Sequence, residues 1–164
     1  MSVYLSADPM FIGVDPGTVN GGWAIISALN GRFVACGHVA GLVQCPPGGY
    51  LLAGVEAQSP RRTDGSGAQY GLSKLLVDYG RVQGIFEAWK TPCALIYPIT
   101  WRTHFGLKKA PWRAILAKAV ECCPSAPVKL QKDDGMAVAI LLAHYARYLY
   151  QSTNEIGGSE WKRK

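Results

Sequence analysis

The chain has 164 residues, 49% of them hydrophobic, which suits one domain with a buried core and leaves no room for a second full domain. Seventeen Lys and Arg against eleven Asp and Glu give a net charge of +6, which favours a polyanionic partner such as nucleic acid. Five cysteines without Cys-x-x-Cys spacing argue against a disulfide framework or a zinc site. No apolar run approaches the roughly 18 residues of a membrane span, so we expect a soluble, cytoplasmic protein with no membrane partner.

The first third of the chain has the pattern of consecutive strands. Runs of β-type residues predict strands at 10–14, 22–26, 33–39 and 50–55. The pair Asn30-Gly31 tolerates positive φ and predicts a two-residue hairpin turn between the second and third strands. The first three strands should therefore form a meander.

The rest of the chain alternates helical and strand patterns. Apolar residues at helical spacing from Leu72 to Trp89 predict a long amphipathic helix. Further elements are expected as a strand at 93–97, a helix from Pro111 that stops at Pro124, and a helix from about Asp133 to Tyr150. The prediction is one α/β domain over residues 1–151, a mixed five-stranded sheet with helices packed on it, followed by a flexible polar tail at 152–164.

Acidic residues fall where these elements begin or end. Asp15 follows the first strand, Glu56 follows the fourth, and Asp133 and Asp134 open the last helix. If the first and fourth strands are neighbours, Asp15 and Glu56 can face each other, and a helix on the sheet can add Asp134. Such oxygen ligands suit Mg²⁺ or Mn²⁺, and two ions about 4 Å apart can activate a water and stabilise the leaving oxygen of a phosphodiester.

Each acid also has an ordinary explanation. Asp15 can be a turn former before Pro16-Gly17, Glu56 can be a solvated charge at a strand end, and an aspartate at 133–134 can cap a helix. Only the joint pattern points to a metal site.

Three motifs follow one another along the chain: Ile12-Gly-Val-Asp-Pro-Gly17, Val55-Glu56, and Asp134-Gly-Met-Ala-Val-Ala-Ile140 with His144. In this order they resemble the motifs of RuvC-type DNA-junction resolvases, which have a ribonuclease-H-like fold. The resemblance covers about residues 11–150, and similar short versions occur in bacteriophages. It implies a metal-dependent endonuclease that resolves four-way (Holliday) junctions by paired nicks, with two Mg²⁺ or Mn²⁺ ions held by Asp15, Glu56 and Asp134. The products would carry a 5′-phosphate and a 3′-hydroxyl, and the cell would be a bacterium or a phage-infected host.

The resemblance also implies DNA contacts. The segment Tyr97-Pro-Ile-Thr-Trp-Arg102, followed by Gly106-Leu-Lys-Lys109, is similar to the family's proline-led basic stretch, so Arg102 with Lys108 or Lys109 would hold phosphates. Arg61, Arg62 and Lys74 would track the adjoining DNA arms, and Tyr70 would stack on an unpaired base or else be the first core residue of its helix. Without the family, these are ordinary loop cations.

The family pattern is incomplete at one position. The family places an acid or a His three residues before the helix aspartate, where this chain has Gln131, and in the other register the acid falls on Ala137. Asp133 is our substitute for the fourth metal ligand.

The family works as a homodimer, because a four-way junction is two-fold symmetric. The stretch from Phe86 to Trp89 can supply the interface, or it can belong to the core of one subunit.

Three other interpretations compete with a junction resolvase. ATPases related to sugar kinases and actin also have a loop like Asp15-Pro-Gly-Thr18, but they need two such domains, for which 164 residues leave no room. A flap or RNA/DNA-hybrid nuclease would have the same catalytic cluster. A catalytically inactive protein that binds structured DNA would lack a carboxylate, and Gln131 is the one hint of that.

Overall fold

The computed structural model describes residues 8–17, 20–45, 47–57 and 66–160, with the backbone alone at 66–75 and 155–160. Arg61 and Arg62 lie outside the described residues, as do the side chains of Tyr70 and Lys74.

Five strands form one mixed sheet with the order β3-β2-β1-β4-β5. The strands are β1 (Met10–Asp15), β2 (Gly22–Ser27), β3 (Phe33–His38), β4 (Tyr50–Glu56) and β5 (Cys93–Ile96). β1, β2 and β3 pair in antiparallel fashion, whereas β4 is parallel to both β1 and β5. The predicted meander and the predicted five-stranded α/β sheet are confirmed.

The turn between β2 and β3 is longer than predicted. Residues 28–32 separate the strands, so the two-residue hairpin turn at Asn30-Gly31 is wrong. Gly31 does adopt positive φ, at 71°, but Asn30 does not. Asn30 instead accepts a hydrogen bond from the Arg32 N–H through its side-chain oxygen, at 3.0 Å. This Asx-type bond fixes a wider turn, in which one residue with positive φ is sufficient.

The described residues also form four α-helices and two short 3₁₀ helices. They are η1 (Val39–Gln44), α1 (Ser66–Ala88), α2 (Pro98–His104), α3 (Trp112–Cys122), η2 (Gln131–Asp133) and α4 (Asp134–Glu160). The sequence pattern did not predict α2, which begins with Pro98 at its first position, where a missing N–H costs nothing. α4 continues into the segment that was expected to be a flexible tail.

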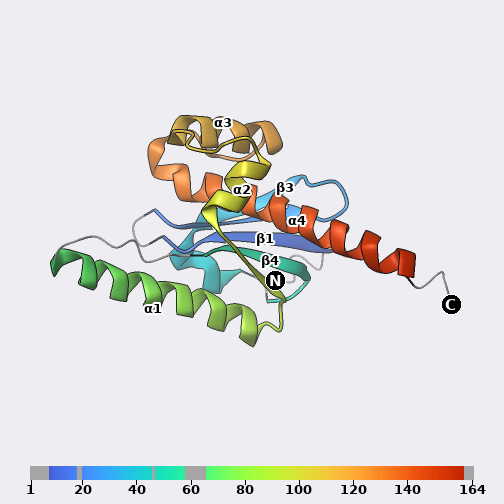
Figure 1. Cartoon of the computed structure of the whole chain (residues 1–164), viewed down its shortest axis with the longest axis horizontal. Helices are drawn as coiled ribbons and strands as arrows, with labels where there is room; N and C mark the ends of the chain where they lie inside the picture. Colours follow the sequence, from blue (N-terminus) through green and yellow to red (C-terminus); the bar gives the residue numbers. More distant parts are fainter. Residues whose placement is uncertain (1–7, 18–19, 46, 58–65, 161–164) are drawn as a thin grey trace, which may run out of the picture.

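The helices cover the two faces of the sheet unequally (Figure 1). α4, with α2 and α3 beyond it, lies on one face, and α1 lies on the other. Because side chains alternate along a strand, Phe11 packs in the α4 core while the next residue, Ile12, packs in the α1 core. Phe86 is fully buried and Trp89 packs beside it, so this part of α1 belongs to the core of the protein.

Small residues let α4 lie directly on the sheet. A methyl group added at Gly13 in β1 would overlap the carbonyl oxygen of Ala139, because the two backbones are in contact there. Such close approach needs glycine on the strand and alanine on the helix. The contact fixes α4 along β1, and so fixes where its first turn lies.

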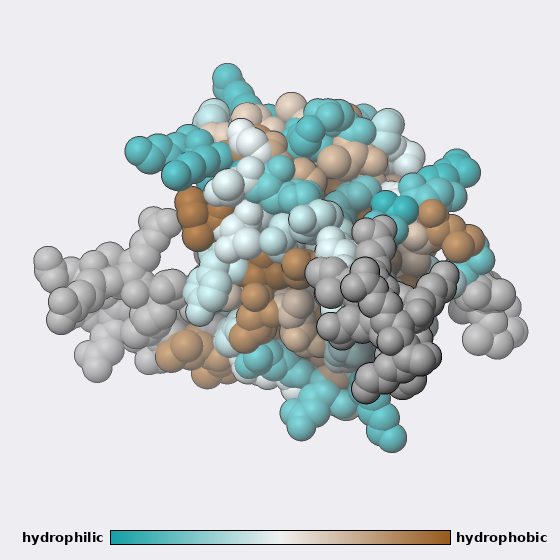
Figure 2. All heavy atoms as spheres, turned by 45° about the vertical axis from the view of Figure 1, so that its right-hand side comes forward, coloured by the Kyte–Doolittle hydropathy of each residue, from teal (hydrophilic) through white to brown (hydrophobic). Residues whose placement is uncertain are grey.

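The surface carries both hydrophobic and hydrophilic side chains. Figure 2 shows hydrophobic side chains in the middle of one face, between hydrophilic side chains along its upper and lower margins. Leu95 of the edge strand β5 is 48% exposed, but β5 has only four residues, which limits pairing with another chain at this edge. Among the described helices, none combines the length and the apolar character that crossing a bilayer requires.

Candidate active site

Asp15 and Glu56 end two neighbouring parallel strands. Val14 of β1 lies opposite Val55 of β4, so the next residue on each strand is an acid at the same edge of the sheet. In open α/β sheets, sites form at this carboxyl edge. The condition that the sequence analysis set, that the first and fourth strands are neighbours, is met.

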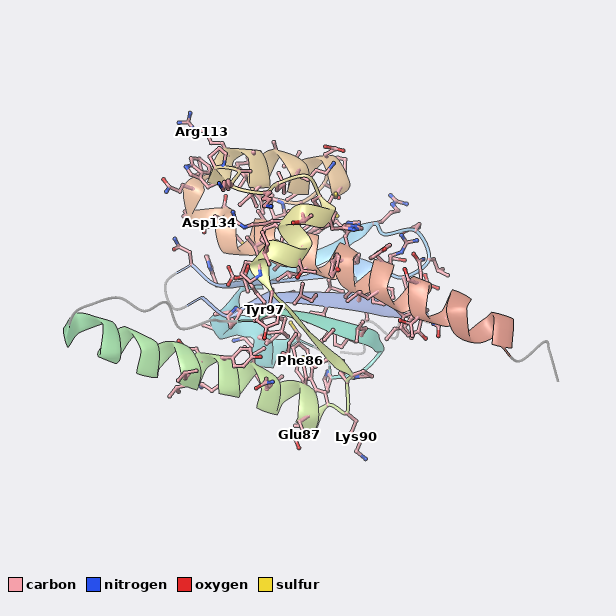
Figure 3. All side chains as sticks on the ribbon, viewed as in Figure 1. Phe86, Glu87, Lys90, Tyr97, Arg113 and Asp134 are labelled. Carbon is pink, nitrogen blue, oxygen red and sulfur yellow. The ribbon has the colours of Figure 1, made fainter. Side chains whose placement is uncertain are left out.

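The start of α4 brings Asp134 to the same edge. Gly135 forms a parallel bridge with Gly21, just before β2, and Gly22 of β2 pairs with Asp15. A methyl group at Gly135 would overlap the carbonyl oxygen of Asn20, so the helix start and the β1–β2 loop touch through their backbones. Figure 3 shows Asp134 at the beginning of α4, at the end of the sheet where this loop lies.

The three carboxylates interact electrostatically. Burial of the carboxyl group and the nearby charge of Glu56 raise the pKa of Asp15 to about 7, and Asp134 adds a smaller effect in the same direction. The Gly17 N–H donates to Asp15 Oδ1 at 3.0 Å and partly opposes this rise in pKa. Asp15 is therefore a turn former and a member of an acidic cluster at once, and among the described residues no cation contributes to the shift of its pKa.

This donor set fits a divalent metal ion. All three side chains offer carboxylate oxygens, the ligands that Mg²⁺ and Mn²⁺ prefer, and a cation would offset the repulsion that raises the pKa of Asp15. Within the described residues, no three His, Cys, Asp or Glu side chains already surround a common point as metal ligands. The three acids are thus neighbours that do not form a preassembled metal site.

Asp133 makes different contacts from its neighbour Asp134. It is buried, and its Oδ2 accepts hydrogen bonds from the Lys129 and Leu130 N–H groups, both at 2.8 Å. These bonds lower the pKa of Asp133. The carboxylate therefore caps the turn before α4, the ordinary role that the sequence offered for one acid of this pair.

Trp101 is a site residue to which the sequence analysis gave no role. Its indole Nε1–H donates to Glu56 Oε1 at 2.9 Å, and its side chain is fully buried. The available signal was its place in the proline-led motif, directly before Arg102.

Of the predicted DNA-contacting cations on the α2 side, Arg102 is half-buried and the two lysines are exposed. The Arg102 guanidinium lies 5.1 Å from the centre of the Trp101 ring, in a cation–π arrangement. Lys108 and Lys109 are exposed in the turn after α2, where Lys109 has a positive φ of 59°.

His144 lies apart from the acidic cluster. Its Nε2 is 3.3 Å from the Cys123 Sγ, and it packs beneath the β2–β3 turn near Gly31. Burial, with a smaller effect of Arg147, lowers the pKa of His144 to about 4. The motif histidine of α4 therefore packs as a neutral side chain between Cys123, which follows α3, and the β2–β3 turn.

The sheet order, the helices on its two faces and the acidic edge define a ribonuclease-H-like α/β fold. The fold is shared with RuvC of Thermus thermophilus, solved in complex with a Holliday junction substrate, at a TM-score of 0.60 and 16% identity over 85% of this chain and 96% of that chain. A second Thermus thermophilus RuvC structure matches over the same shares with a TM-score of 0.49. No protein-family model matches the sequence, and neither does any curated protein.

Proposed function

We propose that this protein is a metal-dependent endonuclease that cuts branched DNA, resolving four-way junctions by paired nicks. The observation that carries the proposal is the convergence of Asp15, Glu56 and Asp134 at one edge of a RuvC-type sheet, with the pKa of Asp15 raised to about 7. A structural role does not require three acids to lie at one edge of the sheet, where the charged form of Asp15 is disfavoured.

The three acids would hold two Mg²⁺ or Mn²⁺ ions. Ions held in this way activate a water and stabilise the leaving oxygen of a phosphodiester. Asp15 and Glu56 are fixed by the ends of β1 and β4, and Asp134 by the contact of α4 with the β1–β2 loop. Asp133 would support the site indirectly, because two backbone N–H groups already bind its Oδ2.

The basic side chains would position the DNA. Arg102 contacts the ring of Trp101, and Trp101 donates its hydrogen bond to Glu56. A phosphate held by Arg102 would therefore lie beside the acids. Lys108 and Lys109 would contact the same strand, and Arg61, Arg62, Lys74 and Tyr70 would meet the adjoining arms and the strand-exchange point.

A homodimer would give the paired nicks their symmetry. On α1, Phe86 points toward the sheet, while Glu87 points away from it, as does Lys90 just after the helix (Figure 3). With Phe86 committed to the core, the outer side of α1 offers Val77, which is 60% exposed, followed by Gly80, Gly84 and Ala88 at helical spacing. Two such helices can approach closely, because nothing lies within 4 Å of a methyl group added at Gly84. Such a dimer would act on DNA in the cytoplasm of a bacterium or a phage-infected host.

The test is cleavage of a synthetic four-way junction beside a linear duplex, a flap and an RNA/DNA hybrid, each with Mg²⁺, Mn²⁺ or EDTA. We expect symmetric nicks in the junction with either metal and none in EDTA. Cutting restricted to the flap or the hybrid would keep the nuclease and overturn its substrate. Tight junction binding without cutting would favour an inactive DNA-binding protein.

A further inference from the structure

Trp101 connects the acidic edge to the α2 side of the protein. It comes from α2, 45 residues after Glu56, and its side chain has no exposed surface. Its indole Nε1–H is directed at Glu56 Oε1, at 2.9 Å. A buried tryptophan usually finds a partner for this N–H group, but the partner here is a carboxylate at the proposed catalytic edge.

A second tryptophan lacks a hydrogen bond of this kind. Trp23 of β2 has a buried Nε1 with no hydrogen-bond partner among the described residues. It packs in the α1 core, on the face of the sheet opposite Trp101. The chain therefore tolerates one unpaired indole, while the indole beside the acidic cluster is paired with one of its members.

We propose that Trp101 is a positioning residue, which holds the Glu56 carboxylate in the orientation that binds metal and supports Arg102 on its ring face. The inference rests on the proposed function and deepens it. A glutamate has three rotatable side-chain bonds, and a hydrogen bond to a charged oxygen is stronger than one between neutral groups, so one N–H donor can restrict Glu56 considerably.

The two parts of this role can be tested separately, because they depend on different groups of Trp101. The N–H group acts on Glu56, whereas the aromatic ring acts on Arg102, whose guanidinium is 5.1 Å from the ring centre. Phenylalanine keeps an aromatic ring and lacks the donor, and leucine lacks both. The substitutions Trp101→Phe and Trp101→Leu should therefore affect metal binding and DNA binding to different extents.

The test measures Mn²⁺ binding to the full chain without DNA, by calorimetry, together with kcat and KM for the junction. We expect Trp101→Phe to weaken Mn²⁺ binding about 10- to 100-fold, as loss of a group that orients a ligand commonly does, and to lower kcat with little change in KM. Trp23→Phe is the matched control, because it truncates a tryptophan without removing a hydrogen bond. Equal Mn²⁺ binding by both variants would overturn the inference.

Two further comparisons distinguish a specific loss of metal binding from a simple folding defect. In a Glu56→Gln background, the same Trp101→Phe change should alter Mn²⁺ binding less than about twofold, since the two residues act through one bond. An undiminished effect there would mean that Trp101 does not act through Glu56. Trp101→Leu should in addition weaken junction binding in EDTA, and binding as tight as that of Trp101→Phe would overturn the ring's role in supporting Arg102.

The failures of the two proposals are distinguishable. If the wild-type chain binds Mn²⁺ and cuts the junction while Trp101→Phe behaves as Trp23→Phe, the positioning role alone is wrong. If the wild-type chain neither binds Mn²⁺ nor cuts DNA, the proposed function fails and this inference fails with it.

Discussion

The carboxylate of Asp15 is subject to two interactions with opposite effects on its pKa. Its Oδ1 accepts the Gly17 N–H and so shapes the loop after β1. At the same time burial and the charge of Glu56 raise its pKa to about 7 from an ordinary 3.8. Over that interval the folded state holds the proton more tightly than the unfolded state does, so this group makes the metal-free protein less stable as pH rises.

We therefore predict that Asp15→Asn stabilises the metal-free protein at pH 8 by about 1–3 kcal/mol, because it removes a charge that the fold disfavours. Thermal unfolding in EDTA measures this, and the gain should shrink as the pH is lowered toward 5. Asp78→Asn, which removes an acid from α1 that pairs only loosely with Arg81 at 3.9 Å, should show no such gain. An Asp15→Asn protein no more stable than wild type at pH 8 would contradict the electrostatic account.

His144 has the opposite pH dependence. Its pKa is lowered from 6.5 to about 4, so its contribution to stability is complete above pH 6.5 and is lost as the pH falls toward 4. Because the two residues act in opposite directions over overlapping ranges, the pH profile of the wild-type protein alone cannot reveal either of them. Only the difference between wild type and Asp15→Asn isolates the acidic site.

At the scale of elements, the contact between α4 and the β1–β2 loop positions the third acid. Gly135 and Gly21 meet through their backbones, and Gly22 pairs with Asp15 one position further along. The glycine at 135 is thus required by space, since any side chain there would meet Asn20. This explains why Asp134 is followed directly by glycine inside a helix, where glycine is otherwise unfavourable.

We predict that Gly135→Ala moves the first turn of α4 away from the loop, lowers junction cutting at least tenfold, and destabilises the fold by about 1–3 kcal/mol. Cleavage rates and chemical denaturation measure the two effects. The control is Gly41→Ala, whose added methyl group would lie at an ordinary 3.7 Å from Trp23 Nε1. Unchanged cutting by Gly135→Ala would mean that Asp134 is not part of the catalytic site.

Several elements and most of the acidic edge follow from sequence patterns. The strands of the sheet are predicted because alternating or continuous apolar runs end at Gly, Pro and Asp turns, and such local signals also place Asp15 and Glu56 at strand ends. α2 could not be predicted, because its seven residues are too few to show a helical period of apolar residues. The separate roles of Asp133 and Asp134 could not be predicted either, since both acids are good helix-start residues and only their contacts in the folded protein distinguish them.

At the scale of the whole molecule, junction resolution requires two active sites in a fixed relation. The outer side of α1 can provide a self-complementary surface, because Val77 is exposed and residues 80, 84 and 88 are small. Its inner side is already used, with Phe86 and Val82 buried against the sheet.

We predict that Gly84→Arg gives a folded monomer that makes single, uncoordinated nicks. The side chain has open space in one subunit, since nothing lies within 4 Å of an added methyl group, but it would block two α1 helices from meeting. Analytical ultracentrifugation and the ratio of single to paired nicks measure the result. Gly84→Ala should remain dimeric, and a dimeric Gly84→Arg protein would place the interface elsewhere.

The central claim is that Asp15, Glu56 and Asp134 form a metal-dependent phosphodiester-cutting site, and the most direct measurement is the single-turnover cutting of a four-way junction by Asp15→Asn in Mn²⁺. We predict a loss of at least about a thousandfold in rate, since the substitution would remove a proposed ligand to the catalytic ions. Junction binding in EDTA should be unchanged or tighter, because one negative charge near the DNA is gone. An Asp15→Asn protein that cuts at the wild-type rate would contradict the claim.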